Sequence, residues 1–506
     1  MTRSKLPIVS DSNTAAASAC GHGGLTPVAP ANAPSVHAEK SFGGNALLVT
    51  LGCAKNLVDS EIMLGALQSK GFRPVSDPQQ ADLIVVNTCA FLQSAVEEGV
   101  DRILELARYK ETGRCRRLVV AGCMVERYRS DLEQSLPEVD RFISTDELLQ
   151  VADEDDTAAA TFDSARRPYF LYDESMPRLR STLGHTSYVK IAEGCDRPCA
   201  FCIIPKIRGS FRSRPIESVV GEARDLVLDG VKELNLVAQD LTAYGSDLSG
   251  ARIKRSMLSE LLGRFGDLRA ETSRDFWVRL LYAYPIGVDE MLIDQIRSSP
   301  VVCKYLDMPL QHISHAVLKR MNRPLGERGT RGLIEKIRLQ APEIALRTTF
   351  IVGFPGETEA DVDSLEQFVG EGHFTHVGVF TYSQEAEAKS YHFDEQVPDD
   401  VKEARRKRVM ERQQQVLAER ASMVVGTTIP VLLENFHEES DLLLTARAEW
   451  QAPETDGEII VNEIDDSIVN DDESFTPEPL LGKFAEVEIR EVLGYDFVGK
   501  LVAIKD

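Results

Sequence analysis

The residues whose spacing most clearly predicts chemistry are three cysteines, Cys195, Cys199 and Cys202. They form a CxxxCxxC pattern within EGCDRPCAFCIIPKIRG, and the whole chain has 9 cysteines among 506 residues. Three thiolates on one tight loop can bind three irons of a 4Fe-4S cluster, which leaves the fourth iron open to another molecule. The alternative for the same residues is a zinc site with His185 as fourth ligand. We favour the cluster, because zinc knuckles rarely follow a strand of a βα barrel.

A second set of cysteines is spread along the first part of the chain. Cys53, Cys89 and Cys123 each end an apolar run, in ALLVTLGC, ADLIVVNTC and LVVAGC. If these runs are neighbouring strands of a parallel sheet, their carboxyl ends meet at one edge, where α/β folds bind ligands. The alternative is three half-buried core cysteines, since cysteine is among the most buried residue types. Cys115 and Cys303 do not share this position, and we interpret both as structural.

Alternating apolar and amphipathic segments predict how the CxxxCxxC loop is positioned. The expected strands are residues 187–192, 233–237, 276–281, 302–308, 346–352 and 376–383. The expected helices are residues 216–228, 257–268, 289–296, 332–339, 359–369 and 401–420. Six strand-then-helix units predict a parallel sheet curled as a partial barrel, with functional loops at the carboxyl ends of the strands.

Polar residues and glycines follow several of these expected strands. We predict Gln239 and Asp240, in VAQDLTAYG, and Gly353 and Gly356, in VGFPGETE, as cofactor-binding residues. Strand ends in a barrel are typical ligand positions, and glycine lets the backbone approach a ribose or adenine closely. The alternative for each single residue is an ordinary loop residue without a ligand.

These motifs together resemble a known family. A CxxxCxxC after the first strand of a six-stranded partial barrel is similar to the radical S-adenosylmethionine enzymes. LGCAKNLVDSE, VNTCAF and AGCM resemble the first domain of the methylthiotransferases within that superfamily, and the acidic β-rich end resembles their TRAM domain. The resemblance extends from about residue 45 to 502.

The resemblance implies cofactors and residue roles. Cys195, Cys199 and Cys202 would be catalytic and hold one 4Fe-4S cluster, whose open iron binds S-adenosylmethionine and yields a 5′-deoxyadenosyl radical. A second 4Fe-4S cluster, which carries sulfur, would be held by Cys53, Cys89 and Cys123. A second S-adenosylmethionine would give the methyl group, and an external one-electron reductant and a sulfur donor are also implied.

The resemblance and the patterning together predict three folded domains of the α/β class. We expect a flavodoxin-like N-terminal domain with the second cluster, a partial (βα)6 radical SAM barrel and a C-terminal all-β, OB-like TRAM barrel. The expected boundaries are a disordered arm at 1–43, then 44–152, a linker at 153–180, 181–420 and 421–503.

Charge favours a protein substrate over a nucleic acid. The formal net charge is -23, and residues 421–506 contain 20 Asp and Glu against 5 Lys and Arg. Nucleic-acid binding depends on Lys and Arg, so high-affinity binding to nucleic acid is not expected. The family has one branch that acts on adenosine in transfer RNA and another that acts on an aspartate of ribosomal protein S12. An acidic module suits S12, which is a strongly basic protein. The sequences of the barrel motifs also resemble the branch that acts on S12.

The predicted activity is therefore addition of a methylthio group to the β-carbon of an S12 aspartate. The alternatives are methylthiolation of transfer RNA adenosine and, from another class, a non-catalytic iron–sulfur electron carrier. No stretch of about 18 apolar residues is present, so we expect no membrane association and a cytoplasmic location.

Overall fold

The computed structural model describes residues 43–153, 170–248, 255–469 and 476–505. They form two compact units, and each is described by itself. One contains the described residues up to Leu171, with Ser175–Ser181 and Lys206–Arg208; the other contains Tyr172–Glu174, Thr182–Pro205 and the described residues from Gly209 to Lys505. The predicted disordered arm with Cys20, apart from Gly43, lies outside the described residues, as do residues 154–169 of the predicted linker. In the described part of the chain, no helix is long and apolar enough to cross a membrane.

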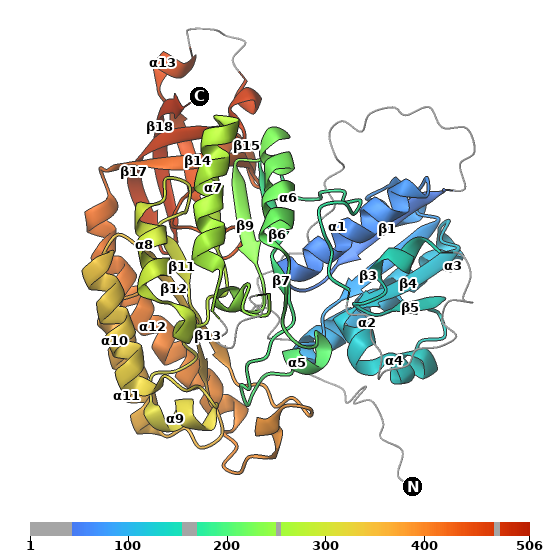
Figure 1. Ribbon diagram of the computed structural model, residues 1–506, viewed down its shortest axis with the longest axis horizontal. Helices are drawn as coiled ribbons and strands as arrows, with labels where there is room; N and C mark the ends of the chain where they lie inside the picture. The colour runs from blue at the N-terminus through green and yellow to red at the C-terminus, as the bar shows by residue number, and fades with distance from the viewer. Residues whose placement is uncertain (1–42, 154–169, 249–254, 470–475, 506) are drawn as a thin grey trace. The chain divides into compact units, whose positions relative to one another are not determined.

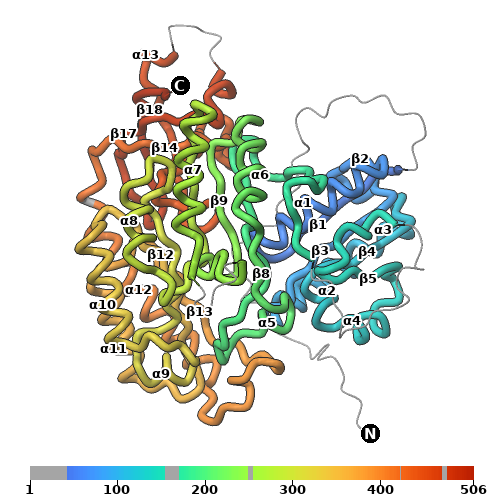
Figure 2. The backbone as a smooth tube through the Cα atoms, viewed as in Figure 1, coloured from blue at the N-terminus to red at the C-terminus, as the bar shows by residue number. Residues whose placement is uncertain are grey.

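The first unit is built on a five-stranded parallel sheet with strand order β2-β1-β3-β4-β5 (Figure 2). Its strands are β1 (Asn45–Thr50), β2 (Arg73–Pro74), β3 (Leu83–Thr88), β4 (Arg117–Gly122) and β5 (Arg141–Ile143). Its helices are α1 (Ala54–Ser69), η1 (Pro78–Gln80), α2 (Gln93–Ala107), α3 (Tyr109–Thr112), α4 (Cys123–Ser135) and η2 (Leu148–Ala152). The central strand β3 is buried along its whole length because helices cover both sheet faces. This strand order is that of flavodoxin-like folds, so the predicted class is confirmed.

The second unit contains six parallel strands that curl into a partial barrel (Figure 1). They are β6 (Thr186–Lys190), β9 (Glu233–Val237), β10 (Trp277–Leu280), β11 (Tyr305–Asp307), β12 (Ala345–Val352) and β13 (His376–Thr381). They form two three-stranded sheets, β10-β9-β6 and β11-β12-β13, which a parallel bridge between Val278 and Val302 connects. All six expected strands are present, and the predicted barrel is confirmed.

Helices and short elements follow these strands. The helices are α5 (Ile204–Ile207), α6 (Ile216–Leu228), α7 (Leu258–Thr272), α8 (Glu290–Ser298), α9 (His315–Arg320), α10 (Gly326–Gln340), α11 (Glu359–Gly370) and α12 (Asp399–Val424). The short elements are β7 (Ala192–Glu193), β8 (Arg212–Ser213), η4 (Leu241–Ala243), η5 (Pro285–Gly287) and η6 (Lys389–His392). Helix α10 begins before the expected residue 332, and α9 was not expected. The start of α10, GERGTRG, carries little apolar periodicity, so the sequence gives no helical signal there.

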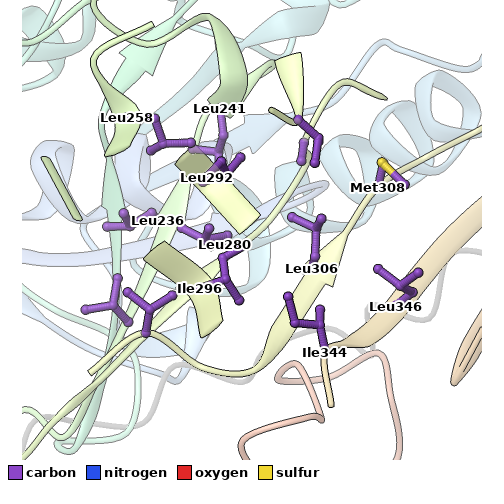
Figure 3. Close-up of a cluster of buried hydrophobic side chains, with 14 of the residues drawn as sticks. Leu236, Leu241, Leu258, Leu280, Leu292, Ile296, Leu306, Met308, Ile344 and Leu346 are labelled. Carbon is purple, nitrogen blue, oxygen red and sulfur yellow. The ribbon is translucent and has the colours of Figure 1, made fainter. Parts of the chain in front are cut away.

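Alternation along the barrel strands separates an apolar layer from a polar interior. On β9, Leu234 and Leu236 pack in the main hydrophobic cluster, whereas Glu233 and Asn235 alternate with them and are buried. Figure 3 shows Leu236, Leu280, Leu306 and Leu346, from four strands, together with Leu258, Leu292 and Ile296 from the covering helices. The apolar faces of the strands therefore hold the helices, and the polar faces are left for the inside of the barrel.

The chain ends in a small closed β-barrel with strand order β14-β15-β16-β18-β17. Its elements are β14 (Thr428–His437), β15 (Ser440–Ala448), β16 (Ile459–Ile464), α13 (Asp466–Val469), η7 (Glu478–Leu480), β17 (Phe484–Leu493) and β18 (Asp496–Lys505). Alternate residues such as Val431, Leu433, Val487 and Ile489 fill its core. The predicted all-β module is confirmed.

This β module packs against the amino ends of the barrel strands within the second unit. The ring of Trp277, the first residue of β10, lies 5.0 Å from that of Phe484. The hydroxyl of Tyr305, the first residue of β11, donates a hydrogen bond of 2.6 Å to Asp456. Because all six strands run parallel, the module covers the end of the barrel opposite to the carboxyl ends of the strands.

Candidate functional site

The three cysteines of the first unit lie at the carboxyl ends of three adjacent strands. Cys53 is the N-cap residue of α1 after β1, Cys89 directly follows β3, and Cys123 begins α4 directly after β4. Strand β3 pairs with β1 on one side and with β4 on the other. The expectation that the three strands are neighbours is therefore confirmed, and the structure brings the three thiols to one sheet edge.

Glycines directly before two of these cysteines let the turns pack closely. Gly52 has a φ of 102° and Gly122 a φ of 95°, a region that side chains strongly disfavour. A Cβ on Gly52 would lie 2.8 Å from the Cβ of Cys89, and one on Gly122 would lie 2.2 Å from Oδ1 of Asn87. Any larger residue would push the cysteine-bearing turns apart.

The thiols influence one another's ionisation, which confirms that they are close. Burial, together with the neighbouring Cys123 and Cys53, raises the pKa of Cys89 to about 12. Burial also raises the pKa of Cys123. Burial opposes ionisation of Cys53 as well, but the positive charges of Lys55 and Arg208 outweigh it and hold its pKa below the ordinary value.

The second set of cysteines lies on a loop after β6 and the short strand β7. The backbone N–H of Cys202 donates to the carbonyl of Cys199 at 3.2 Å, and that of Cys195 donates to the carbonyl of Gly209 at 3.1 Å. Two further N–H groups point at sulfur: that of Arg197 lies 3.4 Å from Sγ of Cys195, and that of Ile204 lies 3.5 Å from Sγ of Cys202. These donors favour thiolates, because they stabilise negative charge on sulfur.

Burial raises the pKa of Cys195 to about 11 and that of Cys202 to about 12. The neighbouring Cys199 also contributes to the raised pKa of both. All eight cysteines in the described residues are free thiols. Thiols of this kind give up their protons when they bind a metal, which is the ordinary chemistry of iron–sulfur ligation.

Two arginines and a tyrosine line the barrel mouth beside this loop. The guanidinium carbons of Arg197 and Arg323 lie 4.3 and 4.1 Å from the ring centre of Tyr284. Arg323 Nη1 also lies 3.7 Å from Sγ of Cys199, and Arg197 Nε donates to Asp240 at 2.7 Å. Arg323 therefore places positive charge beside Cys199, whereas the charge of Arg197 is paired with Asp240.

The residues predicted to bind a cofactor are all at the carboxyl ends of barrel strands. Gln239 and Asp240 follow β9, and Gly353 and Gly356 follow β12. Their immediate partners lie within the protein: Gln239 Nε2 donates to Glu193 at 2.6 Å, and the N–H of Gly353 donates to the Glu357 carboxylate at 2.9 Å. No ligand contact tests these four assignments, which stay predictions.

Two buried polar atoms in the same region fit a bound group. Gln239 Oε1 and Gln311 Oε1 have no hydrogen-bond partner among the described residues, whereas His312 Nε2 lies 3.5 Å from the Glu357 carboxylate. Buried polar groups are ordinarily hydrogen-bonded. Tyr282 and Gln311 have positive φ values of 71° and 73°, a strained conformation that is common at functional sites. The barrel mouth thus offers donors and acceptors to a polar cofactor.

An open cavity lies beside the cysteine loop. Its volume of about 690 Å³ is within the usual size of a small-molecule site. Ala200, between Cys199 and Cys202, forms part of its wall, together with Lys319, Arg320 and His392. Ala200 itself is buried, so the cavity lies next to the loop and none of the three cysteines lines it.

Neither set of cysteines is arranged around a single metal ion. In the described ranges, no three His, Cys, Asp or Glu side chains could hold one ion together.

Sequence reasoning missed the polar side chains that contact the thiols. The side chains of Asn56 and Arg208 contact Sγ of Cys123, and Asp59 accepts a hydrogen bond from Arg208. Arg208 lies six residues after Cys202, within EGCDRPCAFCIIPKIRG, so its charge and its position were the available signals.

Comparison with known proteins divides the chain as the fold does. Residues 45–144 match the family described as "Uncharacterized protein family UPF0004", residues 189–369 match the Radical SAM superfamily, and residues 425–502 match the TRAM domain. The chain is 42% identical over 459 residues to "Ribosomal protein uS12 methylthiotransferase RimO" of Geobacter sulfurreducens, which covers 90% of this chain and 98% of that protein. This chain belongs to the RimO methylthiotransferase family.

A second RimO relative, from Solibacter usitatus, is 46% identical over 455 residues and covers 90% of this chain and 94% of that protein. A solved structure, the radical S-adenosylmethionine methyltransferase TsrM from Kitasatospora setae, is 16% identical and covers 66% of this chain and 72% of that one, with a TM-score of 0.48. That likeness is too distant to bear on the activity. Membership of RimO makes the chain a radical SAM methylthiotransferase, and the superfamily implies a 4Fe-4S cluster and S-adenosylmethionine.

Proposed function

We propose that the chain adds a methylthio group to the β-carbon of an aspartate in ribosomal protein S12. The single observation that carries this proposal is the pair of cysteine triads, one at the ends of three adjacent parallel strands and the other on the loop after β6 and β7, in a chain whose RimO relatives are named for uS12. The acidic β module supports a basic protein as substrate, and it opposes transfer RNA.

Within this proposal, Cys195, Cys199 and Cys202 hold the cluster that binds S-adenosylmethionine, and Cys53, Cys89 and Cys123 hold a second cluster. When bound, these groups would supply hydrogen abstraction, the sulfur and the methyl group. The two chemistries differ, which explains why the chain carries two thiol sites. An external one-electron reductant and a sulfur donor complete the requirements.

The protein's own residues position and shield this chemistry. The backbone N–H groups of Arg197 and Ile204 orient two of the sulfurs. Arg323 places positive charge 3.7 Å from the sulfur of Cys199. Gln239, Asp240, Gly353 and Gly356 would line the S-adenosylmethionine site, with Gln239 Oε1 as a buried acceptor for its amino group.

The direct test is the intact mass of S12, measured with the nucleosides of bulk transfer RNA from cells with and without this gene. We expect S12 to lose a methylthio increment while transfer RNA is unchanged. Loss of methylthio-adenosine with unchanged S12 would replace the proposed substrate by RNA. A chain that binds iron but never cleaves S-adenosylmethionine would be an electron carrier instead.

Variants of single cysteines separate the two sites in the purified protein. Cys199→Ala should abolish formation of 5′-deoxyadenosine, whereas Cys89→Ala should keep it and abolish methylthiolation. Cys115→Ala and Cys303→Ala are matched controls, because both residues are buried yet lie outside the triads. Retained 5′-deoxyadenosine formation in Cys199→Ala would contradict the assignment.

A further inference from the structure

A buried arginine lies among the cysteine-bearing strand ends of the first unit. Arg208 is 4% exposed, and each nitrogen of its guanidinium donates to a different side chain. Nε donates to Sγ of Cys123 at 3.2 Å, Nη1 donates to Asp59 at 2.7 Å, and Nη2 donates to Oδ1 of Asn56. Three hydrogen bonds from one rigid planar group fix the position of the sulfur relative to α1.

Asn56 extends this network to the other two cysteine-bearing turns. Its Nδ2 donates to the carbonyl of Leu51, two residues before Cys53, at 2.9 Å. The same Nδ2 donates to the carbonyl of Thr88, directly before Cys89, at 3.1 Å. Arg208 therefore contacts one cysteine directly and the turns of the other two through a single side chain.

The donors suit a thiolate better than a thiol. A sulfur that binds iron has lost its proton and only accepts hydrogen bonds. Arg208 offers an N–H and a permanent positive charge to such a sulfur, in an environment where little water screens either. Hydrogen bonds to cluster sulfurs and local charge are among the factors that set the reduction potential of an iron–sulfur cluster.

We propose that Arg208 is a positioning residue of the second iron–sulfur site, where it holds Cys123 in its ligating position and stabilises the reduced form of the cluster. This inference rests on the proposed function, because it requires that Cys53, Cys89 and Cys123 hold a cluster. On the chain, Arg208 lies six residues after Cys202, so the segment that follows the radical cysteine motif supplies a residue to the other thiol site.

The experiment uses the full chain with Cys195, Cys199 and Cys202 all changed to alanine, so that iron measures the second site alone. Iron and sulfide per chain, circular dichroism and the midpoint potential are measured for this parent and for Arg208→Gln and Arg208→Lys variants of it. Arg224→Gln is the control, because Arg224 is an exposed arginine that pairs with Glu271 in the other unit.

We expect Arg208→Gln to lower the midpoint potential by at least 59 mV, which is a tenfold change in the ratio of reduced to oxidised cluster. Arg208→Lys keeps the charge but loses the planar fork, so the shift should be partly rescued. Loss of iron in Arg208→Gln with unchanged circular dichroism, restored in Arg208→Lys, equally supports the proposal. The potential is the decisive measurement, since a purely structural residue would not move it.

If Arg208→Gln does not fold, the double variant Arg208→Gln/Asp59→Asn decides, because it removes both charges of the buried pair and leaves two neutral amides. Asp59→Asn alone is the reference for this variant, because loss of a negative charge by itself raises the potential. A potential below that of Asp59→Asn supports the proposal, and a potential equal to that of Asp59→Asn overturns it. The same iron content and potential in Arg208→Gln as in the parent overturn the role of Arg208 alone. A parent that binds no iron overturns the second cluster itself, and this inference with it.

Discussion

At the residue scale, the glycines before the cysteines are as informative as the cysteines themselves. A thiol can ligate iron only from a fixed position, and the turn that carries it must fit beside the neighbouring strand end. Gly122 combines a φ of 95° with backbone and side-chain atoms of Asn87 and Thr88 in the space that a Cβ would occupy. Its lack of a side chain is therefore a condition for the site.

We predict that Gly122→Ala lowers the free energy of unfolding by about 2 kcal/mol or more, from the left-handed backbone and the clash together. In the chain that lacks Cys195, Cys199 and Cys202, it should also lower bound iron well below the parent's. Iron per chain and urea-induced unfolding followed by circular dichroism measure both effects. Gly263→Ala, in α7 with open space around its Cα, is the control and should gain about 0.5 kcal/mol. Full iron in Gly122→Ala would mean that the turn can relax.

At the scale of elements, buried ion pairs join the starts of the barrel strands to the β module. Glu233 begins β9, and both arginines that pair with it are fully or almost fully buried: Arg279 of β10 at 2.8 Å, and Arg447 of β15. Burial raises the pKa of Glu233, but Arg447 and Arg279 outweigh burial and lower it to about 2. Glu233 thus pairs with both arginines, and Arg447 has a second carboxylate partner in Glu434 at 2.6 Å.

Glu233→Gln should lower the free energy of unfolding at pH 7 by about 3–5 kcal/mol, because it leaves two buried arginines without their shared partner. The two tryptophans of the chain, Trp277 and Trp450, lie in the second unit beside this contact, so their fluorescence follows its unfolding in urea. Glu271→Gln, which breaks only the exposed pair with Arg224, should cause no measurable change. An equal effect of both variants would refute the buried pair as a stabilising contact.

Acidic pH should remove the stabilisation that the ionised Glu233 gives to the folded chain. A carboxyl group whose pKa is lower in the folded than in the unfolded chain stabilises the fold above its unfolded pKa of about 4.5, and it loses this effect as the pH falls towards about 2. The stability difference between the original chain and Glu233→Gln should therefore be constant from pH 7 to pH 5 and should shrink below that. A constant difference down to pH 3 would show that Glu233 has an ordinary pKa.

At the scale of the whole molecule, charge is concentrated away from the cysteine loop of the barrel. The β module, with 20 acidic and 5 basic residues in 421–506, packs at the amino ends of the barrel strands, and the CxxxCxxC loop follows the carboxyl end of β6. Long-range attraction can guide a basic protein to the chain without touching the reacting atoms.

Neutralising Glu438, Glu439 and Asp441, which are exposed at the β14–β15 turn, should raise KM for S12 several-fold at low salt and leave kcat unchanged. The effect should fade as ionic strength rises, because salt screens charges beyond about 8 Å at 0.15 M. Steady-state rates at two salt concentrations test this, with Asp225→Asn, Asp229→Asn and Glu260→Gln on the barrel as a charge-matched control. A fall in kcat at unchanged KM would show that the β14–β15 turn affects the reaction itself and not the binding of S12.

The sequence by itself determined much of this protein. The apolar runs predicted all six barrel strands, the three strands of the first unit that end in cysteines, and the closed β module. They could do so because a buried strand leaves a local pattern of apolar residues in the sequence. The spacing of Cys195, Cys199 and Cys202 also predicted the radical motif from local sequence, because the three thiols lie on one short loop. The sequence did not predict the start of α10 or the short helix α9, because their helical conformation depends more on tertiary packing than on the pattern of apolar residues.

Only the tertiary structure decided which charged side chains accompany the thiols and the strand ends. Arg208 meets Asn56 across 152 positions of sequence, and Arg447 meets Glu233 across 214. Arginine and glutamate are mostly exposed, and nothing in their neighbours' identities marks these few as buried. Their burial depends on partners supplied by distant elements, because a charge leaves water only where an opposite charge and hydrogen bonds replace it.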